Sequence, residues 1–166
     1  PPMSSADVAP ALLVALGVAL CIVALASLPS GSRLRRLYGV ADTDDRGARA
    51  NAAVLAGTGA FLLALAAAIV ADVPDRIVAG GALGVSAVGT LGLGWLVRYR
   101  DRRELLTTPD VSRERARRLG GAAMATGVLL CFPLVGVLLG ASETVIAAVT
   151  LFVGGMVGGL VALAYR

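Results

Sequence analysis

Five apolar segments, each long enough to cross a membrane and free of charged residues, determine what this chain can fold into. A helix of about 20 apolar residues spans a hydrocarbon core of about 30 Å. Only 16% of the 166 residues are charged, against about 25% in soluble domains. The sequence predicts an all-α integral membrane bundle of five transmembrane helices, a single domain over residues 1–166. The predicted spans hold 19–22 residues each and are 10–28, 50–71, 77–97, 119–140 and 144–165.

Arginine is concentrated on one side of this predicted topology. Residues 29–49 and 98–118, with the last residue, carry fourteen of the fifteen arginines, and the chain has no lysine. Because basic loops stay in the cytoplasm, we expect the amino terminus outside and the carboxyl terminus in the cytoplasm. The chain is then a multi-pass protein of the cell membrane. The exclusive use of arginine favours a prokaryote with a GC-rich genome.

The arginines next to the spans are predicted to contact the anionic headgroups of membrane lipids. A basic residue beside an anionic membrane surface contributes about 1 kcal/mol of binding. The isoelectric point is about 9.8, but the topology already accounts for the basic charge, so no nucleic-acid partner is expected. The predicted lipid-contacting residues are Arg35, Arg36, Arg98, Arg100, Arg102, Arg103, Arg117 and Arg118.

Glycines four residues apart mark predicted helix-packing faces. Bare glycine lets another backbone approach closely, and in lipid this packing replaces the hydrophobic drive between helices. We expect the last span to touch one helix within the chain and another in a second protomer or a membrane partner. The chain is therefore predicted to form a homo-oligomer or to bind a membrane protein. The predicted packing residues are Gly154, Gly155, Gly158 and Gly159 in the last span, and Gly80 and Gly84 in the third.

A faint internal repeat at an offset of 68 residues suggests a tandem duplication of helical hairpins. The first two spans form one hairpin and the next two the other, with the fifth added. At the helix starts, Asp44, Asp75 and Ser112 are predicted N-caps. The repeat pairs Arg35 with Arg103, Ala48-Arg49 with Ala116-Arg117, and Thr58-Gly59 with Thr126-Gly127.

Most catalytic and metal-binding chemistry is excluded by the residues that the chain lacks. There is no histidine, the usual ligand and general base. Cys21 and Cys131 each stand alone in an apolar segment, which is typical of small buried side chains. The acidic residues of the basic loops alternate with arginine. We therefore expect no catalytic residue, no cofactor and no metal site, and the protein is predicted not to be an enzyme.

Two classes of function remain. Ion pumps and proton-coupled carriers need ionisable groups inside the membrane, and the spans hold none. The favoured class is a non-enzymatic protein that acts through helix packing, as an accessory subunit, an immunity-type protein or a homo-oligomer. The alternative is a passive channel or a lipid-handling transport protein formed between protomers. The short polar stripe of Ser86 and Thr90 is the main feature in its favour.

One stretch resembles a known family. Thr107-Thr108-Pro109, followed by the segment 114–121 that ends in Arg-Leu-Gly-Gly, resembles the loop-to-helix signature of the Sdp-type immunity membrane proteins. The stretches Tyr38-Gly39 and Arg49-Ala50-Asn51, with Asp42 between them, are similar to those of small relatives. The resemblance implies a small multi-span protein that protects against a peptide toxin. It covers about a quarter of the chain, lacks the family's usual tryptophan between the two halves, and assigns no functional residue.

Overall fold

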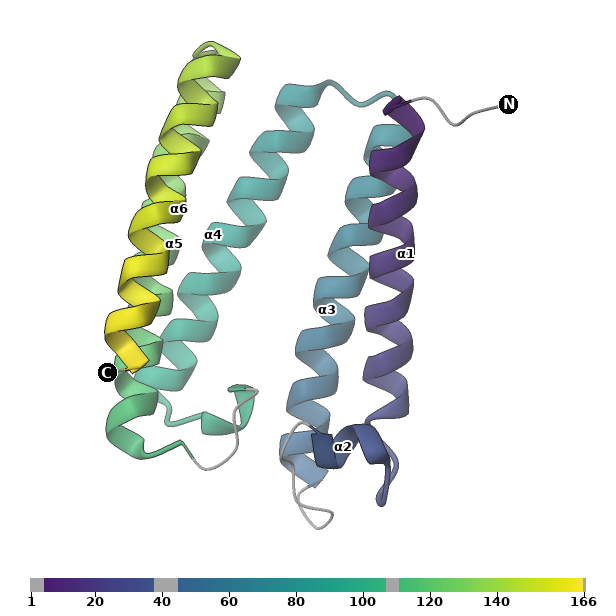
Figure 1. Cartoon of the computed structure of the whole chain (residues 1–166), viewed down its shortest axis with the longest axis vertical. Coiled ribbons are helices and arrows are strands. Elements are labelled where there is room, and N and C mark those ends of the chain that lie inside the picture. The colour runs from purple at the N-terminus through teal and green to yellow at the C-terminus, as the bar shows by residue number, and fades with distance from the viewer. Residues whose placement is uncertain (1–4, 38–44, 107–110, 166) are drawn as a thin grey trace. The chain divides into compact units, whose positions relative to one another are not determined.

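The computed structural model describes residues 5–37, 45–106 and 111–165, and this part of the chain is helical with no strand (Figure 1). The elements are α1 (Ser5–Ala26), α2 (Arg33–Leu37), α3 (Asp45–Val70), α4 (Asp75–Tyr99), the 3-10 turn η1 (Arg103–Leu105), α5 (Arg113–Leu139) and α6 (Glu143–Tyr165).

The prediction of five membrane-length helices is confirmed. Helices α1, α3, α4, α5 and α6 are each long and apolar enough to cross a membrane. Many of their large apolar side chains lie on the surface, including Leu12, Leu139 and Leu151. Large exposed apolar surfaces are unfavourable in water, whereas lipid is as apolar as these side chains.

The helices α3 and α5 begin several residues before their apolar segments. α5 starts at Arg113 because the Ser112 hydroxyl accepts a hydrogen bond from the Arg115 amide at 3.3 Å, so the predicted cap at Ser112 is confirmed. The predicted cap at Asp75 is wrong by one position. Pro74 occupies the N-cap without a side-chain bond, and Asp75 lies in the first turn of α4. The predicted cap Asp44 lies outside the described residues.

The helices α3 and α5 end in the same way. Asp72 and Gly140 both adopt left-handed backbone conformations, with φ of 53° and 75°. In each case the next amide bonds back to a carbonyl five residues earlier at 3.0 Å, from Val73 to Ala68 and from Ala141 to Gly136. This 6→1 bond is the feature of a Schellman-type helix end. Aspartate and glycine are among the residues that tolerate this conformation.

The chain divides into two compact units, described here one at a time. In the first unit, α1 and α3 form a hairpin, and α2 follows α1 (Figure 1). Small side chains line their contact. A Cβ atom added to Gly59 would lie 2.7 Å from the Gly17 carbonyl oxygen, and Ala24, Ala52 and Ala66 are buried. The close approach of the two backbones explains why small residues fill this contact.

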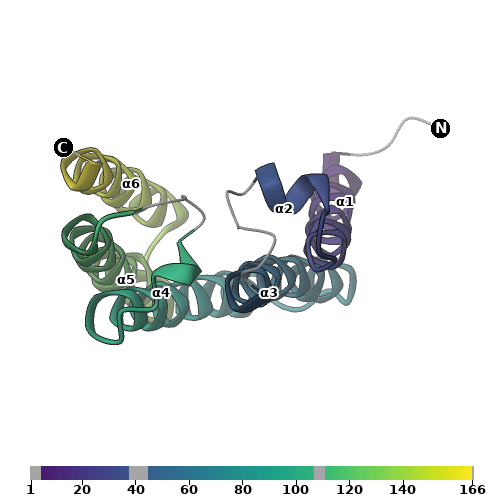
Figure 2. The ribbon, with the colours of Figure 1, turned by 90° about the horizontal axis from the view of Figure 1, so that it is seen from below.

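In the second unit, α5 lies between α4 and α6 (Figure 2). α4 and α5 make the more extensive contact, and α5 and α6 the lesser one. Pro133, inside α5, is among the largest fully buried side chains. The unit is therefore a layer of three helices, with its central helix covered on two sides.

Candidate interaction surfaces

The contact between α4 and α5 is built on paired glycines. A Cβ atom on Gly94 would lie 2.6 Å from the Gly120 carbonyl oxygen, and one on Gly120 would lie 2.8 Å from the Gly94 carbonyl oxygen. One on Gly127 would lie 2.8 Å from the carbonyl oxygen of Ala87. Backbone therefore touches backbone at two levels. These contacting glycines are not among the predicted packing residues, which were chosen for a spacing of four. The helices α4 and α5 instead touch at single glycines spaced along each helix.

The contact of α6 with α5 uses a regular stripe of larger side chains. From Glu143 to Ala164 of α6, the residues that are not exposed recur at spacings of three or four. This is the seam expected between two antiparallel helices. The residues of this stripe are Ile146, Val149, Val153, Val157, Leu160 and Ala164.

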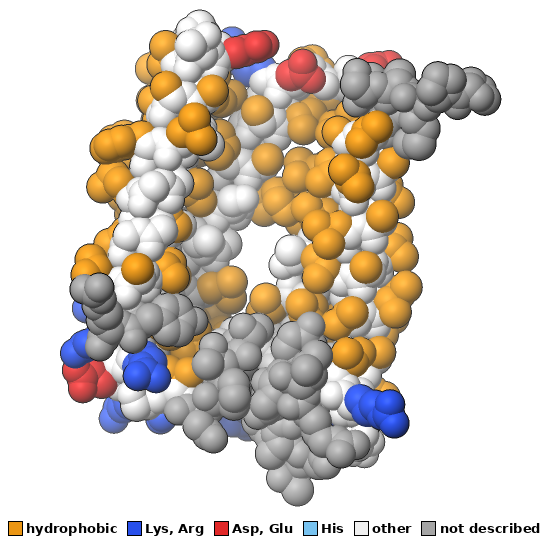
Figure 3. Space-filling view, in the orientation of Figure 1, with side chains coloured by type: hydrophobic (Ala, Val, Ile, Leu, Met, Phe, Trp, Pro, Cys, Tyr) orange, Lys and Arg blue, Asp and Glu red, His pale blue; other side chains and the backbone are white. Residues whose placement is uncertain are grey.

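The four glycines of α6 lie away from this seam. At about 100° per residue, Gly155 and Gly158 stand about 140–160° around the helix from Val153, and a Cβ atom on any of the four would meet nothing within 4 Å. Along α6, white backbone shows between the orange side chains (Figure 3). The expected internal contact is therefore not made to α4 or α5, because α5 already takes the opposite stripe. A contact with another protein stays a prediction.

The two predicted packing glycines of α4 differ from each other. A Cβ atom on Gly80 would lie 3.7 Å from Cγ1 of Val137, an ordinary contact with α5. One on Gly84 would meet nothing within 4 Å. Gly80 therefore takes part in the α4–α5 contact, and Gly84 adds no close approach there.

A basic rim surrounds one end of the second unit, where α4 ends and α5 begins (Figure 3). Three of its arginines pair with acids: Arg103 bonds to Asp101 at 3.0 Å, Arg113 lies 3.7 Å from the same carboxylate, and Arg118 pairs with Glu114. Two others lie over aromatic rings, namely Arg98 over Tyr99 and Arg100 over Trp95. The exposed arginines of the rim are Arg98, Arg100, Arg102, Arg103, Arg113, Arg115, Arg117 and Arg118.

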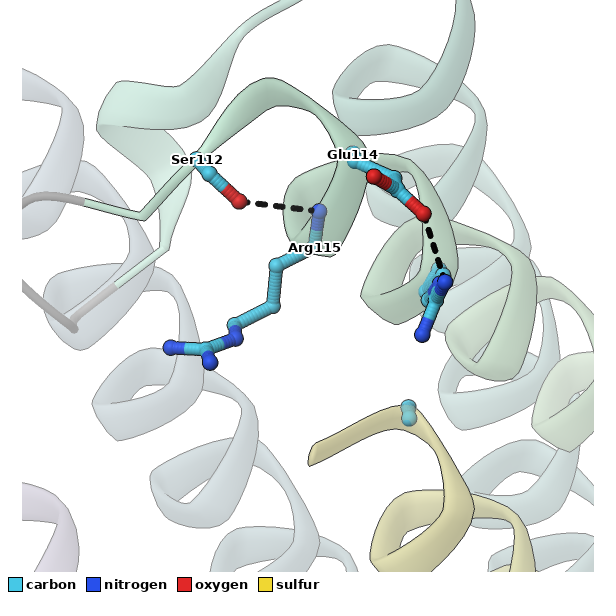
Figure 4. Close-up of a pocket in the computed structure, with 5 residues that line it drawn as sticks. Ser112, Glu114 and Arg115 are labelled. Carbon is cyan, nitrogen blue, oxygen red and sulfur yellow. Dashed lines mark hydrogen bonds and ion pairs between the residues drawn. The ribbon is translucent and has the colours of Figure 1, made fainter. Parts of the chain in front are cut away.

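A small pocket of about 150 Å³ lies within this rim, between the start of α5 and the end of α6. Figure 4 shows the Ser112 hydroxyl directed at the Arg115 amide, while the Arg115 guanidinium extends away from the cap. Arg115 and Arg117 have no ion-pair partner among the described residues. A helix N-terminus with free guanidinium groups favours an anion such as phosphate, although Glu114 also lines the pocket.

Arg35 does not belong to an exposed basic surface. Its side chain is 1% exposed, and it pairs at 2.9 Å with Asp45, the first residue of α3. Its Nε atom and the Oδ1 atom of the buried Asn51 have no hydrogen-bond partner. The prediction that Arg35 contacts lipid headgroups is therefore wrong for its position here, because the folded hairpin encloses it. Arg36 lies in α2, and its side chain is outside the described part of the chain.

Arg76 has a role that the sequence analysis missed. It lies in the first turn of α4, and its Nε atom donates to the Val137 carbonyl oxygen at 2.7 Å, while its Nη2 atom donates to that of Leu138. Both acceptors belong to the last turn of α5, where carbonyl groups lack partners within the helix. A cation is favourable near a helix C-terminus. The sequence alone does not show, however, that Arg76 of α4 lies beside the end of α5.

Among the described residues, no group of three or more His, Cys, Asp or Glu side chains is placed to hold a metal ion. No protein-family model matches the chain, and neither a curated protein nor a solved structure is significantly similar to it. Of the residues that resemble Sdp-type immunity proteins, 114–121 lie in α5 and 49–51 in α3. Tyr38, Gly39, Asp42 and Thr107-Thr108-Pro109 lie outside the described residues.

Proposed function

We propose that this protein is a non-enzymatic, multi-pass membrane protein that assembles through the glycine face of α6 with a second copy of itself or with another membrane protein. The observation that carries the proposal is the position of Gly155 and Gly158, open and facing away from α5. Glycine in a helix costs about 1 kcal/mol relative to alanine. A helix face that met only lipid would gain nothing in return, whereas a face that receives another backbone does.

The contact between α4 and α5 supports this interpretation of α6. The least exposed residues on the α5-facing side of α4 are Gly80, Leu83, Ala87, Thr90, Gly94 and Val97. A shift of 68 residues carries this stripe to Ala148, Leu151, Gly155, Gly158, Ala162 and Tyr165. The open face of α6 is thus the counterpart of a face that packs on another helix in α4. Its small residues would allow an equally close approach.

Equivalent packing positions also support the proposed tandem repeat. The buried residues Ala48, Ala52 and Gly59 of α3 have buried counterparts 68 positions later in α5, namely Ala116, Gly120 and Gly127. The matching helix ends at Asp72 and Gly140 have the same offset. The pair α1 and α4 departs from the predicted offset, because the buried Gly17 of α1 has its buried counterpart, Ala87 of α4, 70 positions later and not 68. In this repeat α6 corresponds to α4, the first helix of the second hairpin, and its open face corresponds to the face by which α4 packs on α5.

The proposed topology places the basic rim in the cytoplasm and the start of α4 outside. The exposed arginines Arg115 and Arg117 would then bind anionic headgroups at the inner surface, where each basic residue contributes about 1 kcal/mol. The resemblance to Sdp-type immunity proteins remains a prediction. It is compatible with a small protein that works by binding another membrane component.

A passive channel is the less favoured alternative, because threonine hydroxyl groups in the spans bond to their own helices. Thr58, Thr90, Thr126 and Thr150 each donate to the carbonyl oxygen four residues earlier, at 2.7–2.9 Å. A hydroxyl group used in this way contributes little to a continuous water-lined path.

Cysteine cross-linking tests the proposed assembly in native membranes. In a background without Cys21 and Cys131, Gly155→Cys on the open face should form a disulfide-linked dimer if the partner is a second copy. The matched control is Val157→Cys, on the stripe against α5, which should give no dimer. Cross-links to a different membrane protein would identify a hetero-assembly. Equal and negligible cross-linking at both positions would contradict the proposal.

A further inference from the structure

The end of the second unit opposite the basic rim contains a groove of about 560 Å³. Its sides come from α4 (Ala79), α5 (Val137) and α6 (Ile146, Ala147), and its mouth lies where α4 and α6 begin. The volume falls within the range of small-molecule sites, about 300–1,000 Å³. The wall is apolar and made mostly of small side chains, so it can accept a single apolar chain.

Three charged residues stand at the mouth of the groove: Asp75, Arg76 and Glu143. Figure 3 shows red and blue side chains together at this end of the second unit. Arg76 already donates two hydrogen bonds to the carbonyl groups that end α5. Asp75 and Glu143 have no ion-pair partner among the described residues. The mouth therefore carries a net negative charge and two carboxylates free to accept hydrogen bonds.

We propose that this groove binds a cationic amphiphile, a molecule with one apolar chain and a primary ammonium head. The chain would lie along Ala79, Val137 and Ala147, and the ammonium would donate to Asp75 and Glu143. Charge-assisted hydrogen bonds of this kind are stronger than neutral ones. This site is separate from the glycine face of α6 and does not depend on the proposed assembly.

The lining also selects against related molecules. An anionic amphiphile would place its head beside two carboxylates. A quaternary ammonium has no N–H group to donate, and it is usually recognised by aromatic side chains, which are lacking among the described lining residues. The groove should therefore prefer a primary ammonium to both.

Native mass spectrometry of the full chain in a neutral detergent tests the proposal with dodecylammonium, dodecyltrimethylammonium and dodecanoate as probes. We expect one dodecylammonium per chain, and weaker binding of the other two. Asp75→Asn and Glu143→Gln should each weaken dodecylammonium binding about tenfold, the loss expected for one charge-assisted hydrogen bond. Ala147→Leu, which fills the groove from an exposed position, should abolish binding.

The matched control is Glu114→Gln, which removes the same charge at the other end of the unit and should leave binding unchanged. Equal binding of the three probes, or unchanged binding in Asp75→Asn and Glu143→Gln, would overturn the proposal. If Ala147→Leu blocked all three probes equally while the carboxylate variants had no effect, the groove would be a general lipid crevice, and the proposal would be wrong. Thermal unfolding of each variant should match the wild type, which separates loss of the site from loss of the fold.

Discussion

Gly94 and Gly120 hold the backbones of α4 and α5 in direct contact. A methyl group on Gly94 would lie 2.6 Å from the Gly120 carbonyl oxygen and 2.8 Å from the Met124 backbone nitrogen. Neither of these backbone atoms can move aside as the end of a flexible side chain can. Because dispersion packing drives helix association in lipid, this pair accounts for much of the fit between the two helices.

Substitution of Gly94 by alanine should therefore destabilise the second unit. We expect Gly94→Ala to lower the free energy of unfolding by about 1–3 kcal/mol, the usual cost of overpacking, as measured by denaturation in mixed micelles. The control is Gly84→Ala in the same helix, where a Cβ atom would meet nothing within 4 Å. It should be neutral or stabilising, by up to about 1 kcal/mol of helix propensity. Equal effects of the two substitutions would argue against the close contact.

Removal of the Arg76 guanidinium should loosen the end of α5. Arg76→Met leaves the carbonyl groups of Val137 and Leu138 without this donor, and a cation at a helix C-terminus contributes about 1 kcal/mol or less at an exposed site. Hydrogen exchange in the last turn of α5 should become faster, with little change at Gly120 near its start. Arg76→Lys should restore part of the protection. Unchanged exchange in Arg76→Met would show that the cap contributes nothing.

The ion pair of Arg35 and Asp45 should respond unequally to loss of either partner. Asp45 is well exposed, whereas Arg35 is buried. Asp45→Asn therefore leaves a buried guanidinium without its anion, and we expect a loss of about 1 kcal/mol. Arg35→Met removes the charge and the unpaired Nε atom together, so it should cost less than Asp45→Asn or stabilise the hairpin. The double variant should behave like Arg35→Met. A larger loss in Arg35→Met than in Asp45→Asn, by chemical denaturation, would contradict this reasoning.

The proposed membrane topology predicts opposite accessibility at the two ends of α5. In a background without native cysteines, Ser142→Cys should react with an impermeant thiol reagent added to intact cells. Arg113→Cys should react only after the membrane is opened. The reverse pattern would invert the topology, and labelling of both positions in intact cells would rule out a span between them.

The sequence predicted the number and approximate positions of the long helices, because about 20 apolar residues without charge leave few alternatives. It did not predict α2, a five-residue helix that brings Arg35 to Asp45. Arg35 was predicted to contact lipid headgroups, whereas its burial depends on how α2 and its neighbours pack against the hairpin. Charge patterns alone do not contain that information.

The glycines predicted from their spacing also differ from the glycines that make close contacts in the structure. A spacing of four residues drew attention to Gly154, Gly155, Gly158 and Gly159, which touch neither α4 nor α5. The close contacts fall instead at Gly17, Gly59, Gly94, Gly120 and Gly127. These positions follow the stripes along which neighbouring antiparallel helices meet. Such stripes can be recognised only when it is known which helices are partners.

The oligomeric mass of α6 variants, measured by light scattering in a mild detergent, tests the central claim most directly. Gly155→Leu and Gly158→Leu should each reduce the wild-type assembly to single chains or release its partner, while both variants insert normally because they raise hydrophobicity. The control Val161→Leu, at an exposed position of α6 off the centre of the glycine face, should keep the wild-type mass. If both glycine variants kept the wild-type mass and the same co-purifying proteins, the glycine face of α6 would not be an assembly surface.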